Sequence, residues 1–205
     1  MRSILVLALL SGLAGCNRSG SGDEEAAGGI VTPAKGPERY RVLFESSKGN
    51  FTVDVVRGWS PLGADRFHEL VTAGFYNEAR FFRVVPGFVV QFGLAADPAM
   101  TAKWKRNIDD DPAGVSNTPG TVTFATAGPR TRTGQVFINF GDNSRLDSQG
   151  FTPFGRVTDG MGAVMAITAE YEQRPDQGRI TKEGNAYLKA EFPDMDYIRK
   201  ATIVP

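Results

Sequence analysis

Alternation of apolar and polar positions predicts a domain built mainly from short β-strands. Phe51, Val53 and Val55 alternate with more polar neighbours, as in a strand that buries one face, and the run 40–44 ahead of them completes an expected hairpin. Other runs of β-branched and aromatic residues lie at 80–85, 88–92, 154–157 and 197–204, and on both sides of the turn at Gly128-Pro129. Many short strands with few helices favour a closed barrel over an alternating α/β design.

Two segments carry helical signals. Ser60 followed by Pro61 is typical of a helix N-terminus, and Gly74 is expected to end this helix. The apolar face of this helix is expected to contain Phe67, Leu70 and Val71. The short apolar stretch 161–167 suits a second helix.

Two long segments, 94–117 and 170–191, are polar and irregular, and we expect loops there. The first contains Asp109-Asp110-Asp111 directly before Pro112. We expect this acidic run to be a turn with solvated charges rather than a metal site.

Residues 1–16 have the pattern of a targeting segment rather than of folded structure. Arg2 supplies a positive start, 4–10 is apolar, and Leu13-Ala14-Gly15-Cys16 resembles the lipobox of bacterial lipoproteins, in which the Cys becomes the lipidated first residue. The alternative is an ordinary secretory signal with a chance Cys. With Asn rather than Asp after Cys16, we expect a lipid anchor at the periplasmic side of the outer membrane, or else a periplasmic or secreted protein.

Residues 17–38 are expected to be a flexible linker between this anchor and a folded domain at 39–205. Gly, Ser, Ala and Glu predominate in the linker, and it has too little apolar surface to offset the entropy of ordering. A random coil of this length reaches roughly 25 Å.

The composition is that of one soluble domain with a sizeable core. The 205 residues are 41% hydrophobic and 22% charged. The formal net charge is zero, which argues against a nucleic-acid partner. One His and one Cys are too few for an internal disulfide or a zinc site made of several His and Cys ligands.

Candidate chemistry gathers in two blocks. The first is Phe81-x-Arg83-x-x-Pro86-Gly87-Phe88-x-x-Gln91-x-Gly93, in which a cation and an amide stand among apolar residues. The second, 120–138, reads as a strand, a Gly-Pro turn with polar flanks and another strand. Taken alone, the first block favours a structural interpretation, in which Arg83 is an exposed strand residue and Gln91 is at a strand end.

Together the two blocks closely resemble the cyclophilin family of peptidyl-prolyl isomerases, and the resemblance spans roughly residues 40–205. It implies an eight-stranded antiparallel β-barrel capped by two helices, which acts as a monomer on proline-containing polypeptides and needs no metal or other cofactor. The catalytic residues that it implies are Arg83, Phe88, Gln91 and Phe137. The substrate-binding residues that it implies are Val89, Ala125, Thr126, Gln135 and Leu146.

The chain departs from the family pattern at four positions. The family often has Trp where Arg145 stands, His near Phe151, Asn where Thr126 stands and Met where Val89 stands. These differences bear on cyclosporin binding more than on catalysis. Two other functions remain open, a non-catalytic proline-binding chaperone or scaffold of the same fold and a purely structural envelope lipoprotein. Arg83 together with Gln91 argues against the second, because neither residue is needed to build a barrel.

Overall fold

The computed structural model describes residues 29–205 and contains one eight-stranded sheet in which every pair of neighbouring strands is antiparallel. The strands are β1 (Arg39–Ser46), β2 (Gly49–Val56), β3 (Arg83–Val85), β4 (Val89–Phe92), β5 (Thr121–Phe124), β6 (Val136–Asn139), β7 (Pro153–Asp159) and β8 (Ile198–Val204). Their spatial order is β3-β4-β6-β5-β7-β2-β1-β8.

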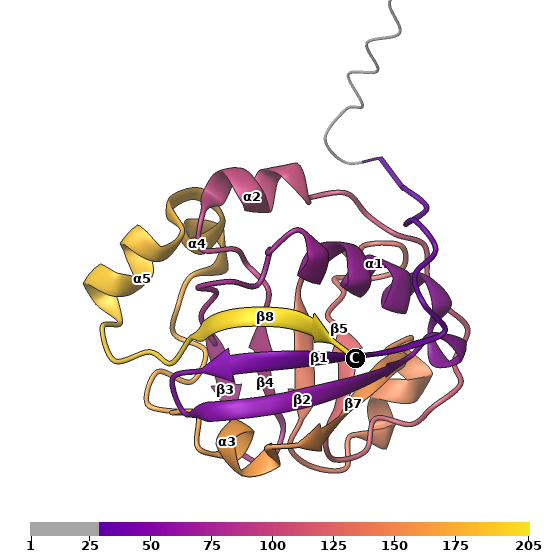
Figure 1. Cartoon of the computed structure of the whole chain (residues 1–205). Helices are drawn as coiled ribbons and strands as arrows, with labels where there is room; N and C mark the ends of the chain where they lie inside the picture. The colour runs from indigo at the N-terminus through magenta and orange to yellow at the C-terminus, as the bar shows by residue number, and fades with distance from the viewer. Residues whose placement is uncertain (1–28) are drawn as a thin grey trace, which may run out of the picture.

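The sheet curls so that its two edges approach each other (Figure 1). Residues just before β3 pair with residues leading into β8, because Phe81 N–H donates to the Asp196 carbonyl at 3.0 Å and Ile198 N–H donates to the Ala79 carbonyl at 2.9 Å. The edges are therefore joined by a short bridge around Arg80 and Tyr197 rather than by a full ladder. The predicted mainly-β barrel class is confirmed.

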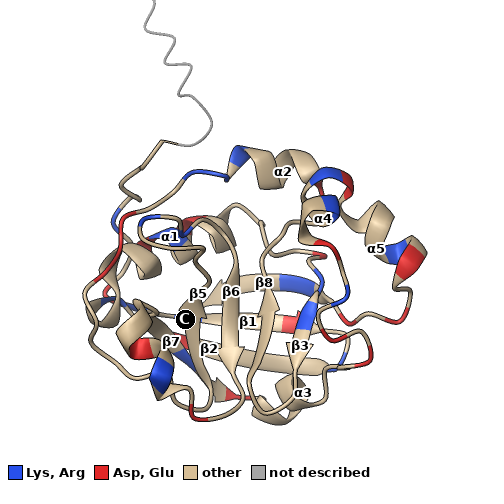
Figure 2. Cartoon of the chain, turned by 180° about the vertical axis from the view of Figure 1, so that it is seen from behind, with Lys and Arg blue, Asp and Glu red and all other residues tan. Residues whose placement is uncertain are grey.

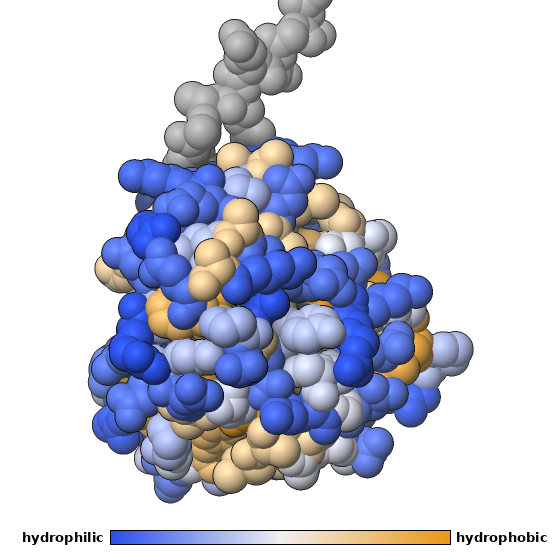
Figure 3. Space-filling model, turned by 90° about the vertical axis from the view of Figure 1, so that its left-hand side faces the viewer, coloured by the Kyte–Doolittle hydropathy of each residue, from blue (hydrophilic) through white to orange (hydrophobic). Residues whose placement is uncertain are grey.

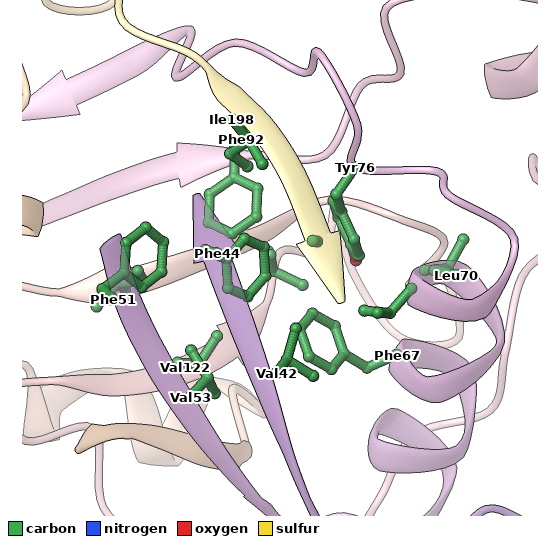
Figure 4. Close-up of a cluster of buried hydrophobic side chains, with 14 of the residues drawn as sticks. Val42, Phe44, Phe51, Val53, Phe67, Leu70, Tyr76, Phe92, Val122 and Ile198 are labelled. Carbon is green, nitrogen blue, oxygen red and sulfur yellow. The ribbon is translucent and has the colours of Figure 1, made fainter. Parts of the chain in front are cut away.

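Helix α1 (Pro61–Thr72) lies beside the sheet, and its side chains Phe67 and Leu70 point into the core between the helix and the strands (Figure 4). Phe67 and Leu70, predicted to lie on its apolar face, are fully buried. Phe67 lies 4.7 Å, centroid to centroid, from Phe154 of β7. Phe44 of β1 stacks on Phe51 of β2 at 4.8 Å, with their planes 3° apart. The core is thus largely aromatic, and it supplies a rigid scaffold for the strands.

The N-terminus of α1 is capped by Asp111, from a segment about fifty residues away. Its carboxylate accepts from the backbone N–H groups of Leu62 and Gly63, both at 2.9 Å, and from the Ser60 hydroxyl at 2.5 Å. It also pairs with Arg132 Nη1 at 3.0 Å, and both side chains are almost completely buried. The expectation of a solvated acidic turn is therefore wrong for Asp111, because its charge is needed inside the fold.

Shorter helices form in the segments expected as loops: α2 (Pro98–Lys103), α4 (Gln177–Glu183) and α5 (Asn185–Glu191). Asp97 caps α2 by accepting from Ala99 N–H, and Asp176 caps α4 by accepting from Arg179 N–H. Apolar residues of α4, of α5 and of the segment after α5 form a second buried cluster with two residues flanking β3 and β4. Its buried members are Phe82, Leu94, Ile180, Tyr187, Leu188, Phe192 and Met195. The predicted helix in 161–167 is present as α3 (Met161–Met165).

The outer face on the α4–α5 side is mostly hydrophilic, with apolar residues in separate small areas (Figure 3). The apolar side chains of α4 and α5 are thus directed inward, toward the second cluster. This arrangement packs α4 and α5 onto Phe82 and Leu94, which flank β3 and β4.

The chain ahead of β1 contacts the domain. Val31 N–H donates to the Asn107 carbonyl at 2.8 Å, and Gly36 N–H donates to Asp65 Oδ1 at 2.9 Å. The predicted boundary at Arg39 coincides with the start of β1, whereas hydrogen bonding to the domain begins earlier. The expected targeting segment with Cys16 and the linker up to residue 28 lie outside the described residues. Within residues 29–205, no helix combines the length and the apolar character needed to cross a bilayer.

Candidate functional site

A cavity of about 320 Å³ opens at the β3–β4 hairpin and the neighbouring strands β5 and β6. Its volume is at the lower end of the range of small-ligand sites. All nine described residues that the sequence nominated for the site line this cavity. They are Arg83, Phe88, Val89, Gln91, Ala125, Thr126, Gln135, Phe137 and Leu146. The structure thus brings together two blocks that lie about forty residues apart, while the catalytic and binding roles of these residues remain predictions.

The hairpin places the cation of the site opposite an amide. Arg83 and Gln91 are direct partners in the β3–β4 register. Arg83 Nη1 donates to Gln91 Oε1 at 3.1 Å, and Gln91 Nε2 donates to Gln135 Oε1 at 2.8 Å. This chain of hydrogen bonds orients the guanidinium and both amides, and it leaves several of the five N–H donors of Arg83 for a ligand.

The position of Gln135 depends on a close approach of two backbones. Gly93 follows β4 with a φ of 104°, and a Cβ there would lie 2.3 Å from the carbonyl oxygen of Gly134. Only glycine tolerates both the backbone conformation and this contact. Gly93 of the first block therefore allows β4 to lie against the segment that carries Gln135.

The apolar part of the cavity is a small cluster separate from the main core. Its buried members are Val89, Phe137 and Leu146, and Phe88 and Phe151 pack against them. The rings of Phe137 and Phe151 meet edge to face at 5.8 Å, with an interplanar angle of 65°. Phe151, near which the family often has His, thus completes an apolar wall suited to a proline ring.

A buried network of asparagine side chains holds this wall. Asn143 Nδ2 donates to the Phe88 carbonyl at 2.9 Å and to Asn139 Oδ1 at 2.7 Å, and Asn139 Nδ2 donates to Asn117 Oδ1 at 3.2 Å. All three asparagines are at most 1% exposed. No pattern in the sequence marks them, because isolated Asn residues usually indicate turns and no spacing rule connects these three.

Asp147 ties the 3₁₀ helix Ser144–Gln149 to the same network. Its carboxylate accepts from Ser116 Oγ at 2.5 Å and from the backbone and side-chain N–H groups of Asn117 at 3.0 and 2.8 Å. Burial raises the pKa of Asp147, but these hydrogen bonds outweigh it and hold the pKa below its usual value. The carboxylate therefore stabilises the fold above the unfolded-state pKa, and this contribution is lost as the pH falls through the folded-state pKa. It fixes the helix that carries the cavity residue Leu146.

A further contact to the guanidinium comes from the segment before α4. Arg83 Nε donates to Gln173 Oε1 at 3.3 Å. The backbone of the same segment is docked on the edge of β3, because Val84 N–H donates to the Glu172 carbonyl at 2.9 Å. Gln177 of α4 lines the cavity as well. No local signal in the sequence points to these residues, because the segment 170–191 has the composition of a polar loop.

We expect Gln173 to act as a positioning residue for Arg83. Gln173→Leu should lower kcat by about two- to fivefold with little change in KM, because it removes one exposed acceptor and leaves the cavity lining intact. Gln173→Glu, which keeps an acceptor oxygen, should retain more activity than the Leu variant. Steady-state kinetics on a proline peptide measure the changes in kcat and in KM separately. Equal kcat values for the wild type and both variants would contradict this role.

The comparison with protein families finds a match over residues 41–185 to the model of the cyclophilin type peptidyl-prolyl cis-trans isomerase/CLD family. Among curated proteins, the chain is 32% identical over 149 residues to a peptidyl-prolyl cis-trans isomerase of Acinetobacter baylyi, covering 68% of this chain and 78% of the relative. It is 33% identical over 152 residues to peptidyl-prolyl cis-trans isomerase-like 1 of Aspergillus fumigatus, covering 69% of this chain and 92% of the relative.

Solved structures agree on the fold. A cyclophilin type peptidyl-prolyl cis-trans isomerase of Cryptosporidium parvum superposes with a TM-score of 0.62 at 20% identity, covering 82% of this chain and 98% of that chain. A second structure with the same protein name, determined in the presence of the dipeptide Ala-Pro, gives a TM-score of 0.61 at 21% identity, covering 80% and 99%.

Proposed function

The chain belongs to the cyclophilin-type family of peptidyl-prolyl cis-trans isomerases and is an isomerase of X-Pro peptide bonds; from this premise we propose that the cavity around Arg83 is its active site and that it serves protein folding outside the cytoplasm. The observation that carries the proposed site is the convergence of all nine nominated residues on one cavity. The Ala-Pro dipeptide present with the Cryptosporidium relative supports proline-containing chains as the substrate class.

The reaction is a rotation and breaks no covalent bond. Its barrier is about 18–20 kcal/mol because the peptide C–N bond has partial double-bond character. Halfway through the rotation the prolyl nitrogen regains its lone pair and becomes a hydrogen-bond acceptor. A guanidinium directed at this nitrogen stabilises the twisted state and not the planar one, which is the differential binding that lowers a barrier. Arg83, held by Gln91 and Gln173, is suited to this role and stays charged at any relevant pH.

The apolar wall supplies what one hydrogen bond cannot. A rate increase of five powers of ten needs about 7 kcal/mol, whereas one charge-assisted hydrogen bond contributes about 1.5–3 kcal/mol. Phe88, Phe137 and Leu146 would clamp the proline ring while the preceding carbonyl turns, and removing the amide from water disfavours its charge-separated planar form. Gln91 and Gln135 would bind the turning carbonyl oxygen directly or through water.

The test of the proposed site is a proline-isomerisation assay on the full-length chain, with a short X-Pro peptide and with a slowly refolding protein substrate. Catalysed isomerisation that is lost on blocking the cavity, for example with Ala125→Trp, supports the proposal. Ala125 is only partly buried at the cavity rim, so a large side chain there should fill the cavity without displacing the core. An Ala125→Trp variant that is folded and fully active would place the active site elsewhere.

The proposed location rests on the sequence around Cys16. If Leu13-Ala14-Gly15-Cys16 is a lipobox, the mature protein starts at Cys16 and carries acyl chains that hold it at a membrane. Its clients would then be extracytoplasmic chains awaiting X-Pro isomerisation, which is slow enough to limit folding.

We expect Cys16→Ser to abolish membrane association. The wild-type protein should partition into detergent and carry lipid mass, and the variant should be soluble and lack that mass, because the sole thiol is gone. Fractionation followed by mass measurement of the mature chain decides the question. A soluble wild-type product without lipid mass would instead indicate an ordinary secreted isomerase.

A further inference from the structure

Arg145 is next to two residues that line the proposed proline cavity, Leu146 along the chain and Phe88 in space. It is an exposed residue of the 3₁₀ helix Ser144–Gln149. Its guanidinium carbon lies 4.9 Å from the ring centroid of Phe88, a residue that lines the cavity. The guanidinium of Arg83 lies 5.8 Å from the same ring centroid. Two cations therefore flank one aromatic wall of the site.

The charge of Arg145 is not neutralised by the residues that surround it. Among residues 29–205, its guanidinium has the contact with Phe88 and no ion pair. The nearest acidic residues along the chain are otherwise engaged: Asp142 accepts from Ser144 N–H, and Asp147 accepts from Ser116 and Asn117. Stacking on a ring leaves the edge of the guanidinium, with its N–H donors, open to a ligand.

The charged residues that line this cavity and a neighbouring one are positive. Among residues 29–205, Arg83 is the one charged residue that lines the first cavity. A second cavity of about 310 Å³ shares Thr131, Thr133 and Gln135 with the first, and Lys105 is the one charged residue in the described part of the chain that lines it. The chain as a whole has 23 basic and 23 acidic residues, and both signs are distributed around the fold (Figure 2). The positive lining is therefore a local feature and not a consequence of overall charge.

We propose that Arg145 forms a carboxylate-binding subsite, and that this isomerase prefers proline segments with Asp or Glu next to the proline. The inference rests on the proposed function, because the proline must occupy the cavity for its neighbour to reach Arg145. A carboxylate can accept two parallel N–H bonds from one guanidinium, which suits a side chain held at the edge of the Phe88 wall. Since Arg145 is exposed, the effect is modest and is screened by salt.

The test compares three peptides that are identical except for Glu, Gln or Lys beside the proline, with each substitution placed before the proline in one set and after it in another. For the wild-type full-length protein we expect kcat/KM to be about two- to fivefold higher for Glu than for Gln in at least one set, and lowest for Lys. The Glu preference should shrink toward one as salt is raised to about 1 M.

Variants assign the preference to one residue. Arg145→Gln should abolish the preference for Glu over Gln. Arg199→Gln should retain it, because Arg199 is also an exposed arginine near an aromatic ring, 5.9 Å from Tyr197, but Tyr197, unlike Phe88, does not line either cavity. A Glu-to-Gln ratio near one in the wild type, or an unchanged ratio in Arg145→Gln, would overturn the proposal.

Binding measurements keep this result separate from the proposed active site. We expect the dissociation constants of the same peptides to show the preference for Glu over Gln whether or not turnover is observed. Absence of turnover with an intact Arg145-dependent binding preference would contradict the proposed catalytic site and leave the carboxylate subsite standing. Turnover without the binding preference would contradict the carboxylate subsite and leave the proposed catalytic site standing.

Discussion

An Arg83→Ala variant should lose at least about tenfold of its kcat/KM toward an X-Pro peptide while keeping its fold. The lost interaction is a hydrogen bond from a charged donor, worth about 1.5–3 kcal/mol, and 1.4 kcal/mol corresponds to a factor of ten. The loss should appear mainly in kcat, because the interaction with the prolyl nitrogen is made in the twisted state. A peptide isomerisation assay measures it, and circular dichroism checks the fold.

Two further variants serve as controls for this result. Arg83→Lys should also be poor, because an ammonium group lacks the planar fork that bonds Gln91 and Gln173 while facing the substrate. Arg156→Ala removes an exposed arginine of β7 that bonds Thr118 Oγ1, and it should remain fully active. Wild-type activity of Arg83→Ala would rule out a mechanism centred on this guanidinium.

The sequence predicted the cavity well because most of its residues lie in two local patterns. Arg83 and Gln91 face each other because Pro86-Gly87 forms the turn of a short hairpin, and such a turn fixes the register of its strands. The resemblance to a known family then placed the second block against the first. The strands, α1 and α3 could be found in the same way from alternation, capping residues and apolar stretches.

What the sequence did not reveal depends on contacts between distant segments. Asp97 and Asp176 carry ordinary N-cap signals, but α2 and α4 are short and polar, so the surrounding pattern favoured loops. Gln173 reaches Arg83 across a separation of 90 residues, and no local pattern indicates this contact. Single polar residues such as Asn139 acquire their roles only when tertiary packing buries them.

Asp111 illustrates the same limit and leads to the largest expected effect on stability. Asp111→Ala leaves Arg132, which is 3% exposed, as a buried charge without its main partner, and it uncaps two N–H groups of α1. Breaking a buried ion pair in this way costs about 3–5 kcal/mol. For a chain of this size we expect the melting temperature to fall by roughly 6–20 °C, measured by calorimetry. Asp109→Ala is the matched control, since its pair with Arg130 is exposed and contributes at most about 1 kcal/mol.

A double variant separates the charge effect from the capping effect. Asp111→Ala combined with Arg132→Met leaves no unpaired buried charge, so it should be more stable than Asp111→Ala alone and should retain only a capping loss of about 0.5–2 kcal/mol plus the altered packing. Thr131 and Thr133, on either side of Arg132, line both cavities. Asp111→Ala should therefore also weaken peptide binding at temperatures where the protein is still folded. If the double variant is destabilised by the sum of the losses measured for Asp111→Ala and Arg132→Met alone, the two charges are not coupled. Unchanged peptide affinity in Asp111→Ala would show that the pair supports α1 without positioning the residues that line the cavities.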